Sequence, residues 1–510
     1  MFDITSLLSL NIIIFAPAVA ALIVASPLFG TNQIYIRRFT KTFATIHLLY
    51  SLFFVAYYLY GSDNFYQEIT ILGNSWLSKL GINAAFGADG FTILLCAFTS
   101  LIFLFVFIIS KTMIRTKHKM YYALMLVLFS STLGIFCAKD MFVFLLFWQT
   151  ELIPIFLLIS QWGGVKAPKA AQKYILYNFS GSLLLMVAMI SLYYYGYHAN
   201  GTLSSSIDFL RIYQADNIFP ELLQDIIFWC LFIGFAVKLP IIPFHTCYTS
   251  CLTEAPAPVR ALISSVLINT AAYGLIRFNL DLFPELFTKF APIIMLIAVT
   301  GILWASFGAF KQKEIVKTTA YINIVYMGFF LLGLSAANKT GFDGAFFIMF
   351  ANIFVAAALS IMTGYIEQTF KTKSFQEIAG LGKFAPRLMS LSYIIIFAVI
   401  GVPLTISFSG FFLVFSGAFS ADFADALMPK ICTAVSFVSF ILLAASGLRL
   451  LDGCFGGISQ TEKKYNDITG HRLMVLLILC LFIIFFGCFP DSLMSFYSDV
   501  TDMLAEVLRV

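Results

Sequence analysis

Long apolar runs alternate with short polar segments along the 510 residues of the chain. Each run has about 20 residues, the length that an α-helix needs to cross a hydrocarbon core about 30 Å thick. The runs lie near residues 5–29, 41–60, 91–110, 119–138, 141–160, 174–196, 225–245, 257–278, 287–310, 316–336, 342–366, 388–418, 428–450 and 471–490. The pattern predicts an all-α polytopic membrane protein with about fourteen transmembrane helices, and we interpret segments 61–90 and 197–224 as in-plane or loop segments.

Prolines interrupt two of these runs. Pro240 and Pro243 follow Lys238 in the seventh run, and Pro403 lies in the twelfth. Proline cannot donate a backbone hydrogen bond, so we expect both helices to be broken where protein or water satisfies the freed carbonyls. Broken helices in corresponding positions are typical of inverted repeats. The sequence therefore predicts N-terminal helices in residues 1–118, two inverted five-helix repeats in 119–280 and 281–451, and a last helix with a tail in 452–510.

The composition of the chain argues against several classes of function. With 60% hydrophobic and 11% charged residues, the chain does not have the composition of a soluble globular protein. Its nine cysteines form no Cys-x-x-Cys motif and no cluster with histidine, and we find no Gly-rich dinucleotide motif. We therefore expect no cofactor or metal in this chain. We also expect no nucleic-acid partner, because the basic residues are spread over one membrane face. The first run is too long for a cleavable signal peptide, so we interpret it as the first transmembrane helix.

The charges are segregated between alternate loops. More than two thirds of the 31 Lys and Arg residues fall in every second loop, where we place Arg260 and Lys373 as well as the pairs Arg37/Arg38, Lys117/Lys119 and Lys463/Lys464. The positive-inside rule puts these loops in the matrix or cytoplasm and both termini on the opposite side.

Two charged residues, Lys238 and Glu151, lie near the middle of apolar runs, where we expect the centre of the bilayer. A lysine at the centre of a membrane helix costs about 2.5–3.5 kcal/mol on insertion scales, which favours a functional role. Lys238 also lies at a predicted helix break, where transporters place residues that bind their substrates. We consider two interpretations: proton transfer by Lys238 and Glu151, or a structural ion pair that joins two helices.

The segment from Phe235 to Thr246, continuing to Glu254-Ala-Pro256, resembles the antiporter-like proton-translocating membrane subunits of respiratory complex I, NADH:ubiquinone oxidoreductase, and among them the chain 4 group. Further matches are Gly87–Gly90, Tyr273–Phe278, Ala320-Tyr321 with Met327-Gly328, and Gly401–Pro403 with Phe408 and Gly410. The resemblance covers nearly the whole chain.

The resemblance implies a core membrane-arm subunit that couples NADH:ubiquinone electron transfer to proton translocation. It implies two inverted five-helix bundles with buried charges and water along the membrane midplane. NAD, FMN, iron–sulfur clusters and ubiquinone would belong to partner subunits, and this chain would contact lipids and other membrane-arm subunits, including neighbouring antiporter-like ones. The expected location is the mitochondrial inner membrane, with both termini in the intermembrane space; the alternative is a bacterial plasma membrane.

Lys238 matches the lysine of the family's helix 7, with His245, Glu254, Asn269, Tyr326 and Asn352 as supporting polar residues. Several positions depart from the family pattern. Gln149 stands where the family has its helix-5 glutamate, and Glu151 follows two residues later, about 200° further round the helix. Asn269 replaces a lysine, Tyr326 and Asn352 replace histidines, and Phe411 replaces a glutamate. The alternatives are therefore a structural membrane-arm subunit with a degraded proton path, and a Na⁺/H⁺ antiporter or membrane-hydrogenase subunit of the same fold.

Overall fold

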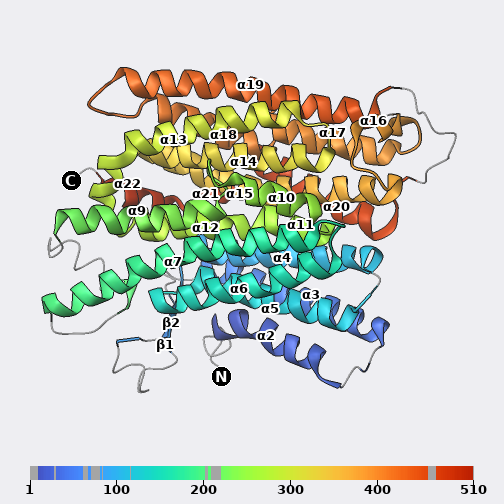
Figure 1. Cartoon of the computed structure of the whole chain (residues 1–510), viewed down its shortest axis with the longest axis horizontal. Helices are drawn as coiled ribbons and strands as arrows, with labels where there is room; N and C mark the ends of the chain where they lie inside the picture. The colour runs from blue at the N-terminus through green and yellow to red at the C-terminus, as the bar shows by residue number, and fades with distance from the viewer. Residues whose placement is uncertain are drawn as a thin grey trace. The chain divides into compact units, whose positions relative to one another are not determined.

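The protein is almost entirely helical in the computed structural model (Figure 1), which describes residues 10–27, 30, 32–60, 67–70, 81–82, 84–114, 116–200, 205–207, 220–378, 380–457 and 467–508. Both chain ends and the predicted loop with Lys463 and Lys464 lie outside these residues. Within them, 11 helices are long and apolar enough to span a membrane, or up to 12 if one bent pair counts as a single span. Two shorter apolar helices, Leu10–Ala25 and Ile406–Phe419, accompany them. The predicted all-α polytopic architecture is confirmed, with 11 or 12 candidate spans among the described residues.

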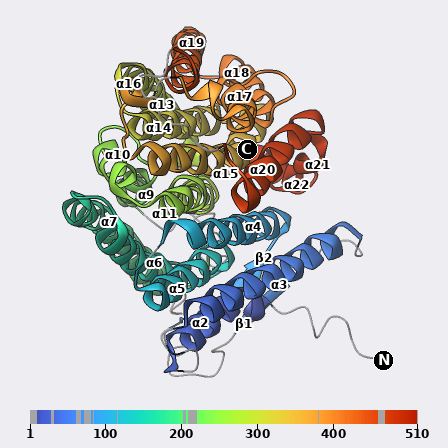
Figure 2. The ribbon, with the colours of Figure 1, turned by 90° about the vertical axis from the view of Figure 1, so that its right-hand side faces the viewer.

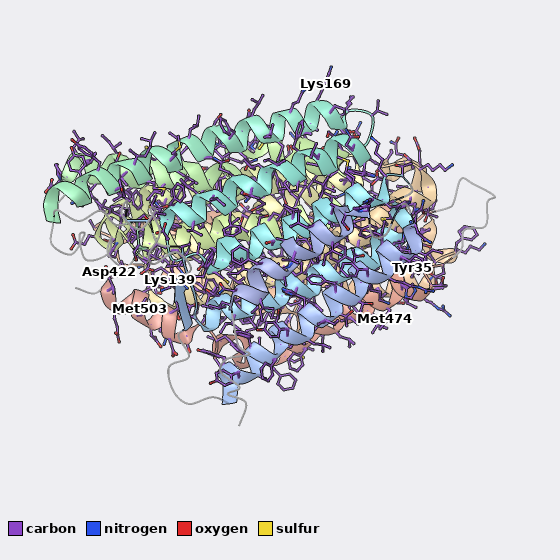
Figure 3. The ribbon with its side chains drawn as sticks, turned by 90° about the horizontal axis from the view of Figure 1, so that it is seen from below. Tyr35, Lys139, Lys169, Asp422, Met474 and Met503 are labelled. Carbon is purple, nitrogen blue, oxygen red and sulfur yellow. The ribbon has the colours of Figure 1, made fainter. Side chains whose placement is uncertain are left out.

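The chain divides into two compact units, of which unit 1 comprises Met1–Val237 and Thr270–Leu286. Its main helices are α2 (Leu10–Ala25), α3 (Gln33–Tyr60), α4 (Gly90–Met113), α5 (His118–Cys137), α6 (Met141–Trp162), α7 (Ala167–Asn200) and α9 (Glu221–Lys238). The last residue of α9, Lys238, is assigned to unit 2. Helix α5 packs against α2 and α6, α3 packs against α4, and α7 packs against α6. In Figure 3, Tyr35 and Lys169 lie toward one end of this unit and Lys139 lies toward the other.

The segment between residues 61 and 90, which we interpreted as an in-plane or loop segment, contains two short strands that the sequence did not predict. Strands β1 (Gln67–Thr70) and β2 (Ala85–Ala88) pair antiparallel, with Gln67 opposite Ala88. Four-residue strands are too short to show a clear alternation of polar and apolar positions. Strand β2 leads directly into α4, whose first turn is capped by Asp89.

Unit 2 comprises Lys238–Asn269 and Phe287–Val510. It holds α10 (His245–Glu254), α11 (Ala257–Leu262), most of α13 (Pro284–Lys311), α14 (Ile315–Ser335), α15 (Lys339–Phe370), α16 (Phe375–Ile378), the 3₁₀ turn η5 (Leu381–Lys383), α17 (Pro386–Ile400), α18 (Ile406–Phe419), α19 (Leu427–Phe455), α20 (Gly470–Cys488), α21 (Asp491–Met494) and α22 (Ser498–Val507). The buried helix α15 packs against α11, α14, α18 and α20, as the end-on view in Figure 2 shows.

Glycines allow α15 and α18 to pack backbone against backbone. A Cβ added at Gly344 of α15 would lie 2.5 Å from the backbone nitrogen of Val414 in α18. A Cβ at Gly417 of α18 would lie 2.5 Å from Gly341 Cα and still closer to Gly341 N. These helices therefore approach more closely than side chains at these positions would permit.

Both helix breaks predicted from prolines are present. Helix α9 ends at Lys238 and α10 begins at His245, so Pro240 and Pro243 lie in the intervening turns. Helix α17 ends at Ile400 and α18 begins at Ile406, with Pro403 between them. Gly401 caps α17 in the left-handed conformation (φ 73°), which glycine adopts without the steric cost of a Cβ atom.

The helix that covers residues 257–280 contains two π-helical segments, which the sequence did not predict. After α11 it continues as η3 (Ile263–Leu267), α12 (Ile268–Gly274) and η4 (Leu275–Leu280), the last two at the point where the chain passes from unit 2 to unit 1. Such π segments are rare among helices in general, and those that occur often lie at functional sites.

Candidate functional site

Lys238 is the last residue of α9 and is buried, with 4% of its surface exposed. The negative end of the helix dipole favours a cation at this position. Pro240 and Pro243 cannot donate to the carbonyls of Ala236 and Leu239, which leaves these oxygens available to other donors. The local sequence thus builds a break that favours a buried positive charge.

The helix after the break carries further polar side chains toward α14. His245 is 9% exposed, and its ring centroid lies 6.1 Å from that of Tyr321. Tyr248 is buried. Glu254, the last residue of α10, is half-buried. The α10–α14 contact is therefore lined with groups that bind protons or hydrogen-bond to water.

Glu151 of α6 is fully buried, whereas Gln149, where the resemblance leads us to expect a glutamate, is half-buried. The two-residue displacement predicted from the sequence therefore does not turn the carboxylate outward. Pro154 removes the backbone donor that would bond Thr150, so α6 has a weakened turn beside Glu151. Glu151 belongs to unit 1 and Lys238 to unit 2.

An aromatic cluster in unit 1 surrounds the last turn of α9. The ring of Phe235 lies 5.6 Å from Trp148 and is stacked at 5.9 Å on Phe278. The indole nitrogen of Trp148 donates to Ser182 Oγ at 3.1 Å. The segment that leads to Lys238 is thus anchored by packing one turn before the break.

Two buried asparagines, Asn269 and Asn352, lie at the positions where the resemblance leads us to expect a lysine and a histidine. Asn269 donates to the carbonyls of Ser265 (2.5 Å) and Met349 (3.3 Å), and Asn352 donates to the carbonyl of Ser264 at 3.0 Å. The Oδ1 atoms of both are buried and have no hydrogen-bond partner among the described residues. Buried acceptors of this kind in proteins commonly bind ordered water.

Tyr326 and Phe411 meet at the second helix break. The Tyr326 hydroxyl donates to the carbonyl of Ala398 at 3.0 Å and lies 2.9 Å from Ser407 Oγ. The Phe411 ring lies 5.3 Å from Tyr326, 4.9 Å from Phe329 and 5.1 Å from Phe440. Phe411 therefore fills this place with apolar rings and carries no group that transfers protons.

The sequence analysis placed Arg260 and Lys373 in loops at the basic face, and for Arg260 this was wrong. Its side chain is 1% exposed within α11 and bonds Glu367 of α15 at 2.6 Å. Lys373 lies 3.4 Å from the same carboxylate and also donates to the carbonyl of Thr253. The error arose because Arg260 lies only six residues after the end of α10, where the sequence suggests a turn.

A second ion pair explains two of the motifs in unit 1. Asp89 caps α4 by accepting from Thr92 N at 2.9 Å, and its other oxygen accepts from Arg277, whose guanidinium lies 5.3 Å from the Tyr273 ring centroid. Burial by itself would raise the pKa of Asp89, but the charge of Arg277 and the hydrogen bonds outweigh it and lower the pKa. The motifs at residues 87–90 and 273–278 therefore join one helix start to one helix end.

Among the described residues no group of three or more His, Cys, Asp and Glu side chains is arranged to hold a metal ion.

Comparison with known proteins agrees with this geometry. Residues 138–448, which include both breaks, match the family described as NADH:quinone oxidoreductase/Mrp antiporter, transmembrane. The chain belongs to this family. It is 32% identical over 438 residues to an NAD(P)H-quinone oxidoreductase chain 4 of Trichormus variabilis, covering 85% of this chain and 80% of the relative. It is 30% identical over 448 residues to NADH-quinone oxidoreductase subunit M of Rickettsia prowazekii, covering 87% and 88%.

The fold of this chain is also found in a solved structure, respiratory complex I from Thermus thermophilus with bound NADH. One chain of that complex aligns with a TM-score of 0.86 at 22% identity, covering 98% of this chain and 100% of that one. The resemblance to the chain 4 and subunit M group of complex I, predicted from the motifs, is confirmed.

Proposed function

We propose that this chain is a membrane-arm subunit of an NADH:quinone oxidoreductase and that Lys238 carries a proton across the membrane centre. The observation that carries the proposal is a buried lysine at the end of a broken helix, inside the region that matches the family. Desolvation disfavours a charged ammonium, whereas carbonyl oxygens and a nearby carboxylate favour it. A movement that changes either contribution loads or releases the proton.

In this proposal the chain has fourteen spans, with inverted repeats in residues 119–280 and 281–451 between N-terminal helices (1–118) and a C-terminal helix (452–510). NADH oxidation, flavin, iron–sulfur and quinone chemistry belong to partner subunits of a mitochondrial inner membrane or a bacterial plasma membrane. Glu151 is the acidic partner that modulates Lys238.

The test compares Lys238→Arg with Lys238→Met in the assembled complex, reconstituted in vesicles. Arginine keeps the charge but does not release its proton, so both variants are expected to lower the proton-to-electron ratio. Lys289→Met, at an exposed lysine of α13, is the control and leaves the ratio unchanged. A normal ratio in Lys238→Arg would show that Lys238 is an ion-pair residue and not a proton carrier.

A second candidate function is a structural subunit with a truncated proton path. It is favoured by the ring cluster around Phe411 and by Asn269, whose amide does not titrate, at two positions where the resemblance expects charged groups. A proton step needs hydrogen-bonded groups within about 3 Å, directly or through water. Normal pumping in both Lys238 variants would favour this candidate.

The proposed orientation is tested by labelling single cysteines. Lys169 in the first turn of α7 and Asp422 between α18 and α19 are exposed, and the charge pattern assigns them to opposite faces; each is replaced by Cys. In a background where the exposed Cys488 is replaced by Ser, we expect a membrane-impermeant thiol reagent to label the two positions from opposite sides. Labelling of both from the same side would refute the span count.

A further inference from the structure

Unit 1 has a hollow of about 600 Å³ between the end of α2, the start of α3 and the first two turns of α5. It is lined by Ala25, Gln33, Lys117, His118, Lys119, Met120, Ala123 and Leu124. One part of the lining is basic and the other is apolar. The ligand that fits such a lining carries a negative group and a hydrocarbon part.

The positive charge at this hollow is not balanced by its own elements. Residues 26–62, 90–138 and 152–207 contain no Asp or Glu, although they carry all the Lys and Arg residues of the first three predicted basic loops. Lys119 has no ion pair with any residue that the structure describes. An anion from outside these segments is therefore needed to neutralise the site.

The start of α5 is held in place beside these lysines. Lys117, the residue before the helix, adopts a left-handed conformation (φ 49°) and makes no side-chain capping bond. Its ammonium donates to Gln161 Oε1 at 2.8 Å, and Trp162 Nε1 donates to the carbonyl of Thr116 at 3.0 Å. The first N–H groups of the 20-residue helix have no acceptor within it, and such groups bind phosphate oxygens.

Arg37 of α3 adds a further cation at the edge of the hollow. Its Nη2 donates to the carbonyl of Ile114 at 3.2 Å and lies 3.3 Å from Nδ1 of His118, a lining residue that is 5% exposed. The guanidinium is thus fixed in orientation by two partners. This leaves the charge near the helix start without a carboxylate beside it.

Apolar side chains continue from the hollow onto the surface of α3 and α5. Ile34 and Tyr35 are 59% and 57% exposed, and Met120 of the lining is 38% exposed. The window of α3 that is apolar enough to span a membrane is only 22% buried within the chain. Inorganic phosphate would use the basic part but would leave this apolar part in contact with water.

We propose that this hollow binds an anionic phospholipid, with the phosphate between Lys117, Lys119 and the start of α5 and an acyl chain along Met120 and α3. Basic pockets between transmembrane helices at the cytoplasmic or matrix side are known to hold such head groups. The proposal concerns a site separate from Lys238 and does not depend on proton transfer by that residue.

The test uses the complete, delipidated membrane complex that contains this chain, titrated with phosphatidylglycerol or phosphatidylcholine and followed by native mass spectrometry. Each lysine that leaves a membrane-facing basic site removes about 1 kcal/mol, or about fivefold in affinity. The double variant Lys117→Gln/Lys119→Gln is therefore expected to bind phosphatidylglycerol at least tenfold more weakly. Phosphatidylcholine binding is expected to stay the same.

The matched control is Lys166→Gln/Lys169→Gln, which removes two exposed lysines from the next basic loop without touching the lining. It keeps phosphatidylglycerol binding if the site is the hollow. Lys119→Gln alone, which breaks no ion pair or side-chain hydrogen bond with the residues that the structure describes, gives an intermediate loss and excludes misfolding as the cause. Equal phosphatidylglycerol binding by the double variant and the wild type, or displacement of the lipid by 10 mM inorganic phosphate, would overturn the proposal.

Discussion

Glu367→Ala is expected to lower the free energy of unfolding of unit 2 by about 3 kcal/mol, which corresponds to a fall in Tm of about 6–12 °C in detergent. The variant leaves Arg260, which is 1% exposed, without its carboxylate, and arginine cannot become neutral by losing a proton. We take the lower end of the range for broken buried pairs because the Glu367 side chain is 29% exposed. Thermal unfolding of the purified complex provides the measurement.

A double-mutant cycle separates this effect from lost packing. Arg260→Leu leaves Glu367 partly in contact with solvent and with Lys373 at 3.4 Å, so it is expected to cost less than Glu367→Ala. The double variant Arg260→Leu/Glu367→Ala is expected to recover a large part of the stability lost in Glu367→Ala. A double variant that is less stable than either single one would contradict the ion-pair account.

The second large effect is expected at Gly417, where α18 approaches α15. Even the first carbon of a valine side chain would lie 2.5 Å from Gly341 Cα, so the two backbones must move apart. Overpacking of a core costs about 1–3 kcal/mol when side chains can adjust, and here only backbone lies opposite. We expect Gly417→Val to abolish assembly, as measured by the amount of chain in the purified complex.

Gly301→Ala is the matched control for that variant. Gly301 lies inside α13 of the same unit, and a Cβ added there has no atom within 4 Å. Alanine has a higher helix propensity than glycine by about 1 kcal/mol, so assembly is expected to be unchanged or improved. Loss of assembly in both variants would mean that glycine itself, and not the close approach of α15 and α18, is required.

Features with a strong local cause were predictable from the sequence. The interruptions around Pro240, Pro243 and Pro403 were predictable because proline removes a backbone hydrogen bond, although α6 continues as a helix through Pro154. The membrane character and the family motifs were equally visible, since they depend on composition and on residues close in sequence.

Features that depend on distant partners were not predictable. The Arg260–Glu367 pair joins residues more than a hundred positions apart, so nothing near either residue indicates the other. Glu151 illustrates the same limit. An angle counted from an ideal helix suggested that its carboxylate turns away, but its burial depends on how α6 packs and on the turn weakened by Pro154.

The π segment η3 changes the phase of the helix that carries Arg260 and Asn269. In a straight α-helix, residues nine positions apart differ by about 900°, which puts them on opposite sides. A π turn takes up about one extra residue and removes about 100° of rotation, so the two side chains come within about a quarter turn of each other. Accordingly, Arg260 bonds Glu367 and Asn269 bonds Met349 O, both on α15. A helical wheel drawn for a regular helix therefore assigns Asn269 to the wrong face. In a relative that lacks one residue between positions 263 and 267, a regular α-helix gives these two positions the same relative orientation without a π turn, since eight residues correspond to about 800°.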